Sequence, residues 1–88
     1  MTKQELLASL KQRVFSHQII DAFSRVARED FVGPDKQKVA YEDRALPLVA
    51  GATISQPSTI AFMLSLLELG SGQKILEIGS GCGYVLAL

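Results

Sequence analysis

The sequence predicts an α/β fold in which a mainly helical region of about seventy residues precedes one β-strand and a glycine-rich loop. Apolar residues recur at helical spacing in three segments, which predicts a helix in each. Residues 74–78 form a short apolar run that leads into a loop with glycine at positions 79, 81 and 83. An apolar strand followed by glycines and a helix start suits a nucleotide-bearing cofactor, because glycines let the backbone approach the ligand.

The first two helices are predicted from their starts and their apolar faces. Thr2 and Glu5 have the spacing of a capping box, which predicts that the first helix begins at Thr2. The second helix is predicted to begin near Ser16. The expected apolar face of the first helix consists of Leu6, Leu10 and Val14. The expected apolar face of the second helix consists of Ile19, Phe23 and Val26.

The middle of the chain is predicted to be non-helical. Residues 36–54 are expected to be extended or irregular, because Pro47 and Gly51 disfavour a helix there. A third helix is predicted to follow Pro57 and to stop near Gly70. Its expected core face consists of Ile60, Leu64 and Leu67.

The strand predicted at 74–78 should need a partner. In the complete sheet of the expected fold it would be an interior strand, and a bare apolar edge invites pairing with another chain. Only five residues follow Gly83, so we expect the chain to be a truncated piece of a larger protein. We therefore expect the tail after about residue 70 to be frayed, refolded or paired in an oligomer.

Charge is distributed unevenly along the chain. Residues 1–44 hold fifteen of the eighteen charged side chains, and the other half of the chain holds three. We expect so weakly charged a half to be covered by other protein or to support self-association. The net charge of zero argues against a nucleic-acid or anionic-membrane partner.

The apolar runs are too short to span a bilayer, and the single cysteine fits a reducing, cytoplasmic location. We predict no metal site.

The spacing of the glycines limits which class of cofactor the loop could bind. A dinucleotide fingerprint would need glycine at position 84, which is Tyr84, and the Gly-Lys-Ser/Thr of a P-loop is absent from the sequence. The acid-x-Gly-x-Gly-x-Gly pattern that begins at Glu77 resembles the first motif of class I S-adenosylmethionine-dependent methyltransferases. This resemblance implies a Rossmann-like parent fold and S-adenosylmethionine as cofactor. The residues that it implies in cofactor binding are Glu77, Gly79, Ser80, Gly81 and Gly83. The alternative is a glycine-rich turn that only packs a helix on a strand.

Three further segments resemble one family. The resemblance is to the protein-L-isoaspartate O-methyltransferases, in which similar segments come in the same order and at the same distance from the glycine loop. In this chain the segments are 26–32, 41–48 and 53–57. The resemblance covers nearly the whole chain. It implies methylation of the carboxylate of L-isoaspartyl residues in damaged proteins, a protein repair reaction, with isoaspartyl peptides or proteins as partners. It also implies a division into a helical N-terminal region over 1–52, which includes an extended loop, and the truncated start of the cofactor domain over 53–88. We expect the isolated chain to be inactive.

Ser55 is the candidate catalytic residue. The resemblance implies this role, because the serine of the Thr-Ile-Ser run is the residue associated with catalysis in the family. A carboxylate is already ionised at neutral pH, so the reaction needs orientation more than a strong base. The Ser55 hydroxyl could supply that orientation by donating a hydrogen bond. The alternative is structural: Ser55 lies two residues before Pro57, where a serine commonly caps a helix.

Two positions depart from the family pattern. Val49 and Ala52 stand where the family usually has glycine and glutamine. They motivate one alternative, a diverged class I methyltransferase with another substrate. A second alternative, a non-catalytic interaction fragment, is motivated by the weakly charged, apolar half of the chain.

The remaining polar residues are given structural interpretations. Cys82 is expected to be a small residue that fits the loop, and His17 to be solvated. A charged helix end is expected to contain Arg25, Arg28, Glu29 and Asp30. A solvated loop is expected to contain Glu42, Asp43 and Arg44.

Overall fold

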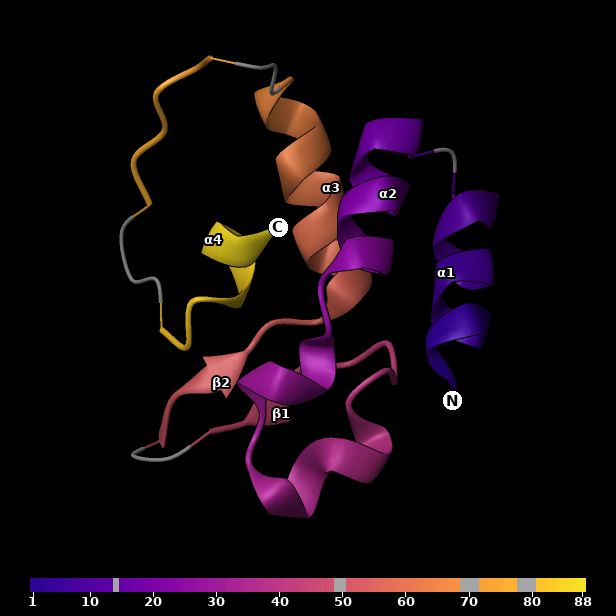
Figure 1. The fold of residues 1–88 in the computed structure, drawn as a ribbon, viewed down its shortest axis with the longest axis vertical. Coiled ribbons are helices and arrows are strands. Elements are labelled where there is room, and N and C mark those ends of the chain that lie inside the picture. The colour runs from indigo at the N-terminus through magenta and orange to yellow at the C-terminus, as the bar shows by residue number, and fades with distance from the viewer. Residues whose placement is uncertain (14, 49–50, 69–71, 78–80) are drawn as a thin grey trace.

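The computed structural model describes residues 1–13, 15–48, 51–68, 72–77 and 81–88, and within them the chain is mainly helical with one two-stranded sheet (Figure 1). The α-helices are α1 (Lys3–Gln12), α2 (His17–Arg25), α3 (Pro57–Leu67) and α4 (Tyr84–Ala87). Two 3₁₀-helices, η1 (Arg28–Phe31) and η2 (Pro34–Val39), lead to the strands β1 (Leu46–Pro47) and β2 (Thr53–Ile54). The predicted helical character of the first seventy residues is thus confirmed over the part described.

Helix α1 begins as predicted. The Thr2 backbone N–H donates to Glu5 Oε1 at 3.0 Å, and the Glu5 N–H donates to Thr2 Oγ1 at 3.1 Å, so the capping box is complete. Leu6 and Leu10 are buried, as their spacing predicted. Val14, the third residue of the predicted face, lies outside the described residues.

Replacing Thr2 by alanine is expected to lower the free energy of unfolding by about 1 kcal/mol, because the hydroxyl that satisfies a free helix amide is lost. The measurement is urea unfolding followed by circular dichroism. Gln4→Ala, on the exposed side of the same turn, is the matched control and should leave stability nearly unchanged. Equal midpoints for the Thr2 variant and the unmodified chain would contradict the prediction.

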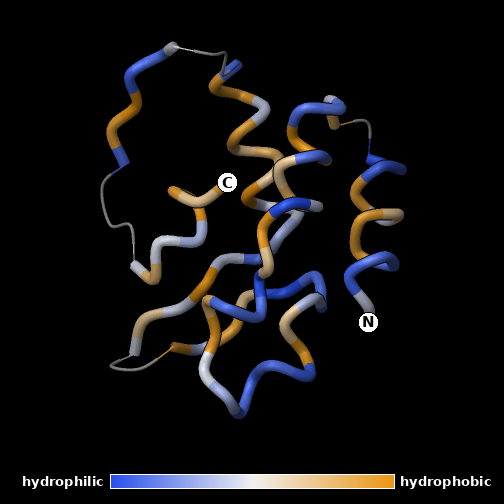
Figure 2. The backbone as a smooth tube through the Cα atoms, viewed as in Figure 1, coloured by the Kyte–Doolittle hydropathy of each residue, from blue (hydrophilic) through white to orange (hydrophobic). Residues whose placement is uncertain are grey.

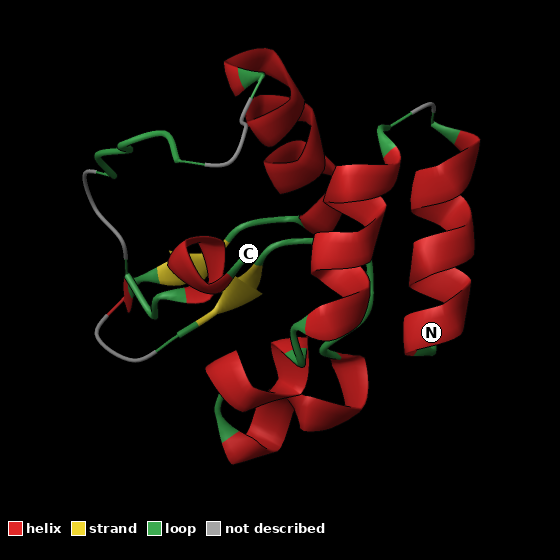
Figure 3. Cartoon of the chain, turned by 45° about the horizontal axis from the view of Figure 1, so that its top comes forward, coloured by secondary structure: helices red, strands yellow, loops and turns green. Residues whose placement is uncertain are grey.

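Helix α2 packs on two sides, which changes its apolar face. Ser16 caps it, and the Ser16 Oγ accepts from the Ile19 N–H at 3.3 Å. The buried residues are Ile20 and Phe23, whereas Ile19 and Val26 are half-buried. Ile20 lies outside the predicted apolar face, because that prediction allowed the helix one narrow apolar stripe facing one neighbour. In Figures 1 and 3, α2 lies between α1 and α3 and contacts both, so a wider arc of its surface is covered.

The segment between α2 and α3 is more ordered than predicted. Residues 36–54 were expected to be extended or irregular, but η2 continues to Val39, because Pro34 occupies the first position of a helical turn after Gly33. The two strands then form an antiparallel hairpin with Leu46 opposite Ile54, and both of these side chains are buried. Gly51 adopts φ +78 in the connecting loop, a conformation that favours glycine.

Helix α3 follows Pro57 as predicted, but only its first half is covered. Ile60 is buried and Leu64 is half-buried, whereas the predicted core residue Leu67 is 57% exposed. This expectation was wrong because α2 packs on the first half of α3, and no described segment covers the last turn. The helix ends at Leu67, and Glu68 at its C-cap has φ 49. The predicted stop at Gly70 lies outside the described residues.

The predicted strand at 74–78 is not present in its described part. Residues 73–77 have no regular secondary structure, and Leu76 is 85% exposed. A strand needs a neighbour to hydrogen-bond with, and Figure 1 shows this stretch running apart from β1 and β2. Figure 2 shows that its middle is hydrophobic and that its ends are hydrophilic. Ile78, the last residue of the predicted strand, lies outside the described residues.

Candidate functional site

Ser55 is located between β2 and α3, with an exposed side chain. Within the described part of the chain, its hydroxyl makes no hydrogen bond, and α3 has no side-chain cap from its own N-cap residue, Gln56. The alternative interpretation of Ser55 as a helix cap is therefore wrong. A free hydroxyl on the surface remains available to donate to a ligand.

The capping function belongs instead to Asp43. The Ser58 backbone N–H donates to Asp43 Oδ1 at 2.8 Å, and Gln56 Nε2 donates to the Asp43 carbonyl oxygen at 2.9 Å. Arg13 Nη2 lies 3.3 Å from Asp43 Oδ2 in an ion pair. The expectation that Asp43 lies in a solvated loop was wrong, because its carboxylate faces the N-terminus of α3, where free amides attract an anion.

Arg28 is the largest departure from the sequence prediction. It was expected at a charged helix end, but its side chain is completely buried. Nε donates to the Ala40 carbonyl oxygen at 2.6 Å, and Nη2 donates to the carbonyl oxygens of Ser55 at 2.9 Å and of Arg44 at 3.4 Å. These carbonyl groups satisfy much of the hydrogen-bonding capacity of the buried guanidinium. They lie too far along the chain from Arg28 to be anticipated from the sequence. The residue lies within 26–32, the first segment of the family resemblance, and that was the only sequence signal for it.

Tyr84 connects the glycine loop to the rest of the site. Its ring packs against Phe23 and Phe31, with centroids 6.3 and 5.4 Å away, and the Arg28 Cζ lies 5.0 Å from the Tyr84 centroid. Arg28 therefore contacts both the Ser55 carbonyl group and the first residue of α4. Ser55 and Tyr84, 29 residues apart in sequence, thus contact the same buried cation.

Both described glycines of the predicted cofactor loop have a positive φ angle. Gly81 adopts φ 56 and Gly83 adopts φ 86, and a Cβ at either position would meet no atom within 4 Å. These positions thus favour glycine for its conformation rather than for space. Gly79 and Ser80, the other predicted loop residues, lie outside the described residues. Cys82, between the two described glycines, is partly buried and packs against the core cluster.

Glu77 presents an unsatisfied acceptor just before that loop. The residue is half-buried, and its Oε1 atom is buried without a hydrogen-bond partner among the described residues. An orphaned buried carboxylate oxygen costs free energy unless a cation or a donor comes to it. It therefore fits a cofactor that carries positive charge and hydroxyl groups.

Two tyrosines near Arg28 have shifted pKa values. Burial raises the pKa of the Tyr41 phenol above its ordinary value of 10.0, and the neighbouring Glu29 carboxylate adds to this effect. Burial also raises the pKa of Tyr84, against the opposing influence of the Arg28 charge. Both phenols are therefore neutral in the folded chain at physiological pH.

These shifts predict a loss of stability in alkali. Because the folded state holds the phenol protons more tightly, stability should be fully present below about pH 10 and should fall as pH rises above it. The measurement is the urea midpoint between about pH 8 and pH 11, with tyrosinate absorbance recorded in parallel. Tyr41→Phe should reduce the slope of stability against pH. A midpoint that is independent of pH in this range would contradict the assignment.

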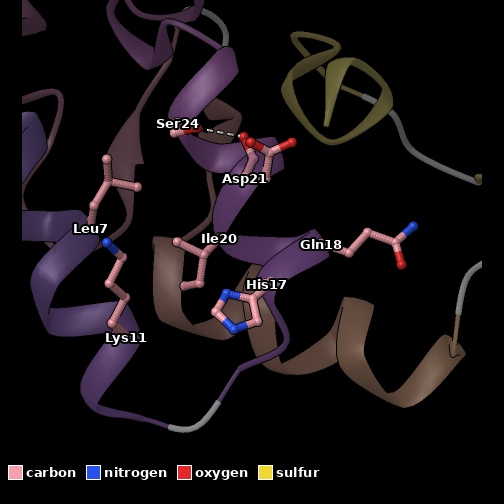
Figure 4. Close-up of a pocket in the computed structure, with 7 residues that line it drawn as sticks. All are labelled: Leu7, Lys11, His17, Gln18, Ile20, Asp21 and Ser24. Carbon is pink, nitrogen blue, oxygen red and sulfur yellow. Dashed lines mark hydrogen bonds between the residues drawn. The ribbon is translucent and has the colours of Figure 1, made fainter.

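A separate open groove lies between α1 and α2 (Figure 4). It has a volume of about 520 Å³, and Lys11 and His17 come to it from opposite helices. His17 is exposed, in agreement with the expectation that it is solvated. None of the predicted site residues lines this groove.

Two further findings apply to all the residues that the structure describes. No helix in this part of the chain is long and apolar enough to cross a membrane. In the same ranges, no three His, Cys, Asp or Glu side chains are grouped so as to hold a metal ion.

Known proteins match the whole chain. The family described as protein-L-isoaspartate(D-aspartate) O-methyltransferase (PCMT) matches residues 1–88. A Methanothrix thermoacetophila protein named protein-L-isoaspartate O-methyltransferase is 48% identical over 88 residues, which are 100% of this chain and 41% of that protein. A protein of the same name from Parvibaculum lavamentivorans is 42% identical over 87 residues, 98% of this chain and 39% of that protein.

A third protein with this name, from Pyrobaculum neutrophilum, is 49% identical over 73 residues, 83% of this chain and 35% of that protein. The chain thus spans about two fifths of the length of the first relatives that it matches. The residues matched by the family include Ser55, Glu77 and the glycine loop. By this match, the chain belongs to the protein-L-isoaspartate O-methyltransferase family.

Proposed function

We propose that the protein to which this sequence belongs transfers the methyl group of S-adenosylmethionine to the carboxylate of L-isoaspartyl residues in damaged proteins. Family membership supports the reaction class. The observation that carries the proposal is the Ser55 side chain, which is exposed and has no hydrogen bond to a described residue, on a backbone whose carbonyl group is held by Arg28. A fixed backbone with a free hydroxyl is what orientation of a reactant requires.

In this proposal, Ser55 orients the carboxylate. An isoaspartyl carboxylate is ionised at neutral pH and needs no base to become a nucleophile. The Ser55 O–H donates a hydrogen bond to one carboxylate oxygen and leaves the other oxygen free to attack in line. The N-terminus of α3 cannot offer its Ser58 amide to the substrate, because Asp43 already accepts from it. The hydroxyl is therefore the donor that this segment supplies.

The cofactor end of the proposed site is formed by Glu77, Gly79, Ser80, Gly81 and Gly83. S-adenosylmethionine supplies an activated methyl group on a sulfonium centre when it is bound. The orphaned Oε1 of Glu77 would accept from or attract the cationic part of that cofactor.

We also propose that residues 53–88 begin a Rossmann-like cofactor domain and that 1–52 precede it. The hairpin of β1 and β2 joins these two parts. A cytoplasmic location is proposed from the single, free Cys82.

The test of cofactor binding is an amide NMR titration of this chain with S-adenosylhomocysteine, the stable product of the cofactor. Saturable shifts of Glu77, Gly81 and Gly83 are expected. Adenosine at the same concentrations, which lacks the amino-acid part, should give weaker shifts at Glu77. Unchanged spectra at all three residues would contradict a preformed cofactor site.

Glu77→Gln is expected to weaken S-adenosylhomocysteine binding by about tenfold or more, because a hydrogen bond to a charged group contributes roughly 1.5–3 kcal/mol. The stability of the free chain should not fall, since this carboxylate oxygen has no partner among the described residues. Calorimetric titration and urea unfolding measure the two quantities. An equal loss of stability and affinity would assign Glu77 a structural role instead.

Substrate choice is a separate question. At the positions where the family usually has glycine and glutamine, Ala52 is exposed and Val49 lies outside the described residues. The alternative of a diverged methyltransferase is tested with an isoaspartyl peptide and its aspartyl twin, on a protein of the relatives' full length that carries this sequence. Methylation of the isoaspartyl peptide alone supports repair, whereas methylation of neither peptide supports another substrate.

A non-catalytic interaction role has one specific observation in its favour. Several large apolar side chains near the end of α3 and after it are exposed in the structure: Phe62, Met63, Leu66, Leu67, Ile75 and Leu76. Such a surface promotes association. Sedimentation velocity over a range of concentrations tests this role. Oligomers that form with no spectral response to S-adenosylhomocysteine would favour it over the enzymatic proposal.

A further inference from the structure

We propose that Arg28 is a positioning residue that couples the two ends of the site: it holds the backbone at Ser55 and the ring of Tyr84 at the same time. This inference rests on the proposed function for its role in methyl transfer. Its structural part, a buried tether between the Ser55 segment and the glycine loop, stands on the contacts of Arg28 alone.

The guanidinium joins its own segment to two others, the loop at 40–44 and Ser55. Its three hydrogen bonds to carbonyl oxygens end on Ala40, Arg44 and Ser55. The Arg28 backbone N–H also donates to the Tyr41 hydroxyl at 3.1 Å. Because the guanidinium is planar and rigid, fixing two of these carbonyl groups largely fixes the position of the third. The Ser55 carbonyl group is thus held relative to the loop at 40–44.

That loop in turn fixes the start of α3. Asp43, next to Arg44, accepts from the Ser58 N–H and from the Gln56 side chain. The segment 55–58 is therefore tied to the loop through both Arg28 and Asp43. Neither tie uses the Ser55 hydroxyl, which explains how the backbone can be rigid while the hydroxyl stays free for a ligand.

The way in which the buried charge of Arg28 is compensated supports a positioning role. No carboxylate of the described ranges lies within ion-pair distance of this guanidinium, and its Nη1 atom is buried without a hydrogen-bond partner there. A buried cation held by carbonyl dipoles and an aromatic face is costly to desolvate. An apolar residue would avoid that cost but would leave the carbonyl oxygens of Ala40, Arg44 and Ser55 without this donor, so the role of Arg28 lies in holding these groups together.

The contact with Tyr84 extends this geometry to the cofactor end. The Arg28 Cζ lies 5.0 Å from the Tyr84 ring centroid, a cation–π distance. Tyr84 directly follows Gly83, whose positive φ sets the start of α4. A shift of the glycine loop on cofactor binding would therefore press on the same guanidinium that holds the Ser55 carbonyl group.

The test compares Arg28→Lys with Arg25→Lys by NMR. Arg25 is exposed and pairs with Asp21, so it controls for the chemistry of the substitution. Without ligand, Arg28→Lys is expected to speed hydrogen exchange of the Ser58 amide by about tenfold, because lysine cannot hold the carbonyl groups of Arg44 and Ser55 together. With S-adenosylhomocysteine, Gly81 and Gly83 should still shift in this variant. The shifts of Ser55 and Gln56, which the tether predicts for the unmodified chain, should disappear.

Each outcome decides a different point. If Arg28→Lys keeps the Ser58 protection and the Ser55 response of Arg25→Lys, the tether is overturned. If Gly81 and Gly83 of the unmodified chain do not respond to S-adenosylhomocysteine, the proposed function fails together with the role of Arg28 in it. The ligand-free exchange then still decides whether the tether exists.

A measurement on the unmodified chain covers the case in which Arg28→Lys does not fold. The side-chain protons of Arg28 should be shifted upfield by the Tyr84 ring, and its Nε–H should exchange slowly because it donates to Ala40 inside the protein. Ordinary side-chain shifts together with fast Nε–H exchange would overturn the proposal without any variant.

Discussion

Replacing Ser55 by alanine is expected to lower the rate of methyl transfer to an isoaspartyl peptide by about 100-fold, because a small misplacement of the reactants costs that much. The fold should be unaffected, since the side chain is exposed and makes no hydrogen bond to a described residue. The measurement uses a protein of the relatives' full length that carries this sequence, with kcat and KM determined separately. The loss is expected mainly in kcat, because in the proposed function the hydroxyl orients the carboxylate rather than providing most of the binding energy.

Thr53→Val is the matched control for this experiment. Thr53 is exposed, lies two residues before Ser55 and loses its hydroxyl in an isosteric replacement. Its variant should retain nearly full activity. If Ser55→Ala and Thr53→Val have the same kcat, or if Ser55→Ala unfolds the protein, the orienting role of the Ser55 hydroxyl is refuted.

Replacing Tyr84 by alanine is expected to lower the free energy of unfolding by about 3–5 kcal/mol, the range for deleting a large buried aromatic side chain. The ring is buried and contacts Phe23, Phe31 and Arg28. It is also the buried residue of α4, a helix of four residues that is too short to persist without tertiary contacts. Because domains have only about 5–15 kcal/mol of stability, this change should release residues 81–88 or unfold the chain.

The matched control for Tyr84 is Leu86→Ala in the same helix. The Leu86 side chain is 65% exposed, so its loss should change stability by no more than about 0.5 kcal/mol. Urea unfolding gives the global effect, and hydrogen exchange at Ala87 and Leu88, whose amides donate to Gly83 and Tyr84, gives the local one. Similar stability of the two variants would show that the Tyr84 contacts do not hold the glycine loop to the core.

The local features of the fold were predictable from the sequence. The capping box at Thr2, the start of α2 after Ser16 and the start of α3 at Pro57 depend on a few neighbouring residues, and each is found where it was predicted. The spacing of Leu6 and Leu10 also identified a buried face. Features that depended on which neighbour covers an element were less predictable: Leu67 is exposed, Ile20 is buried, and residues 73–77 are not a strand.

The candidate site likewise contains residues that the sequence could predict and residues that it could not. The sequence predicted Glu77 and the glycine loop from residue type and short-range spacing, and it predicted Ser55 through the family resemblance. It could not identify Arg28 or Asp43 as parts of the site, since their partners are 12 to 27 residues away along the chain. Charged residues are usually exposed, so only the observed contacts reveal that these two are used inside the protein.

The sequence by itself therefore determined the helix starts and the family to which the chain belongs. The tertiary structure alone decided that Asp43, not Ser55, caps α3, and that a buried Arg28 joins the Ser55 backbone to Tyr84. The physical reason is range: capping and backbone preferences act over three or four residues. Burial and the compensation of a buried charge depend instead on segments that meet only when the chain is folded.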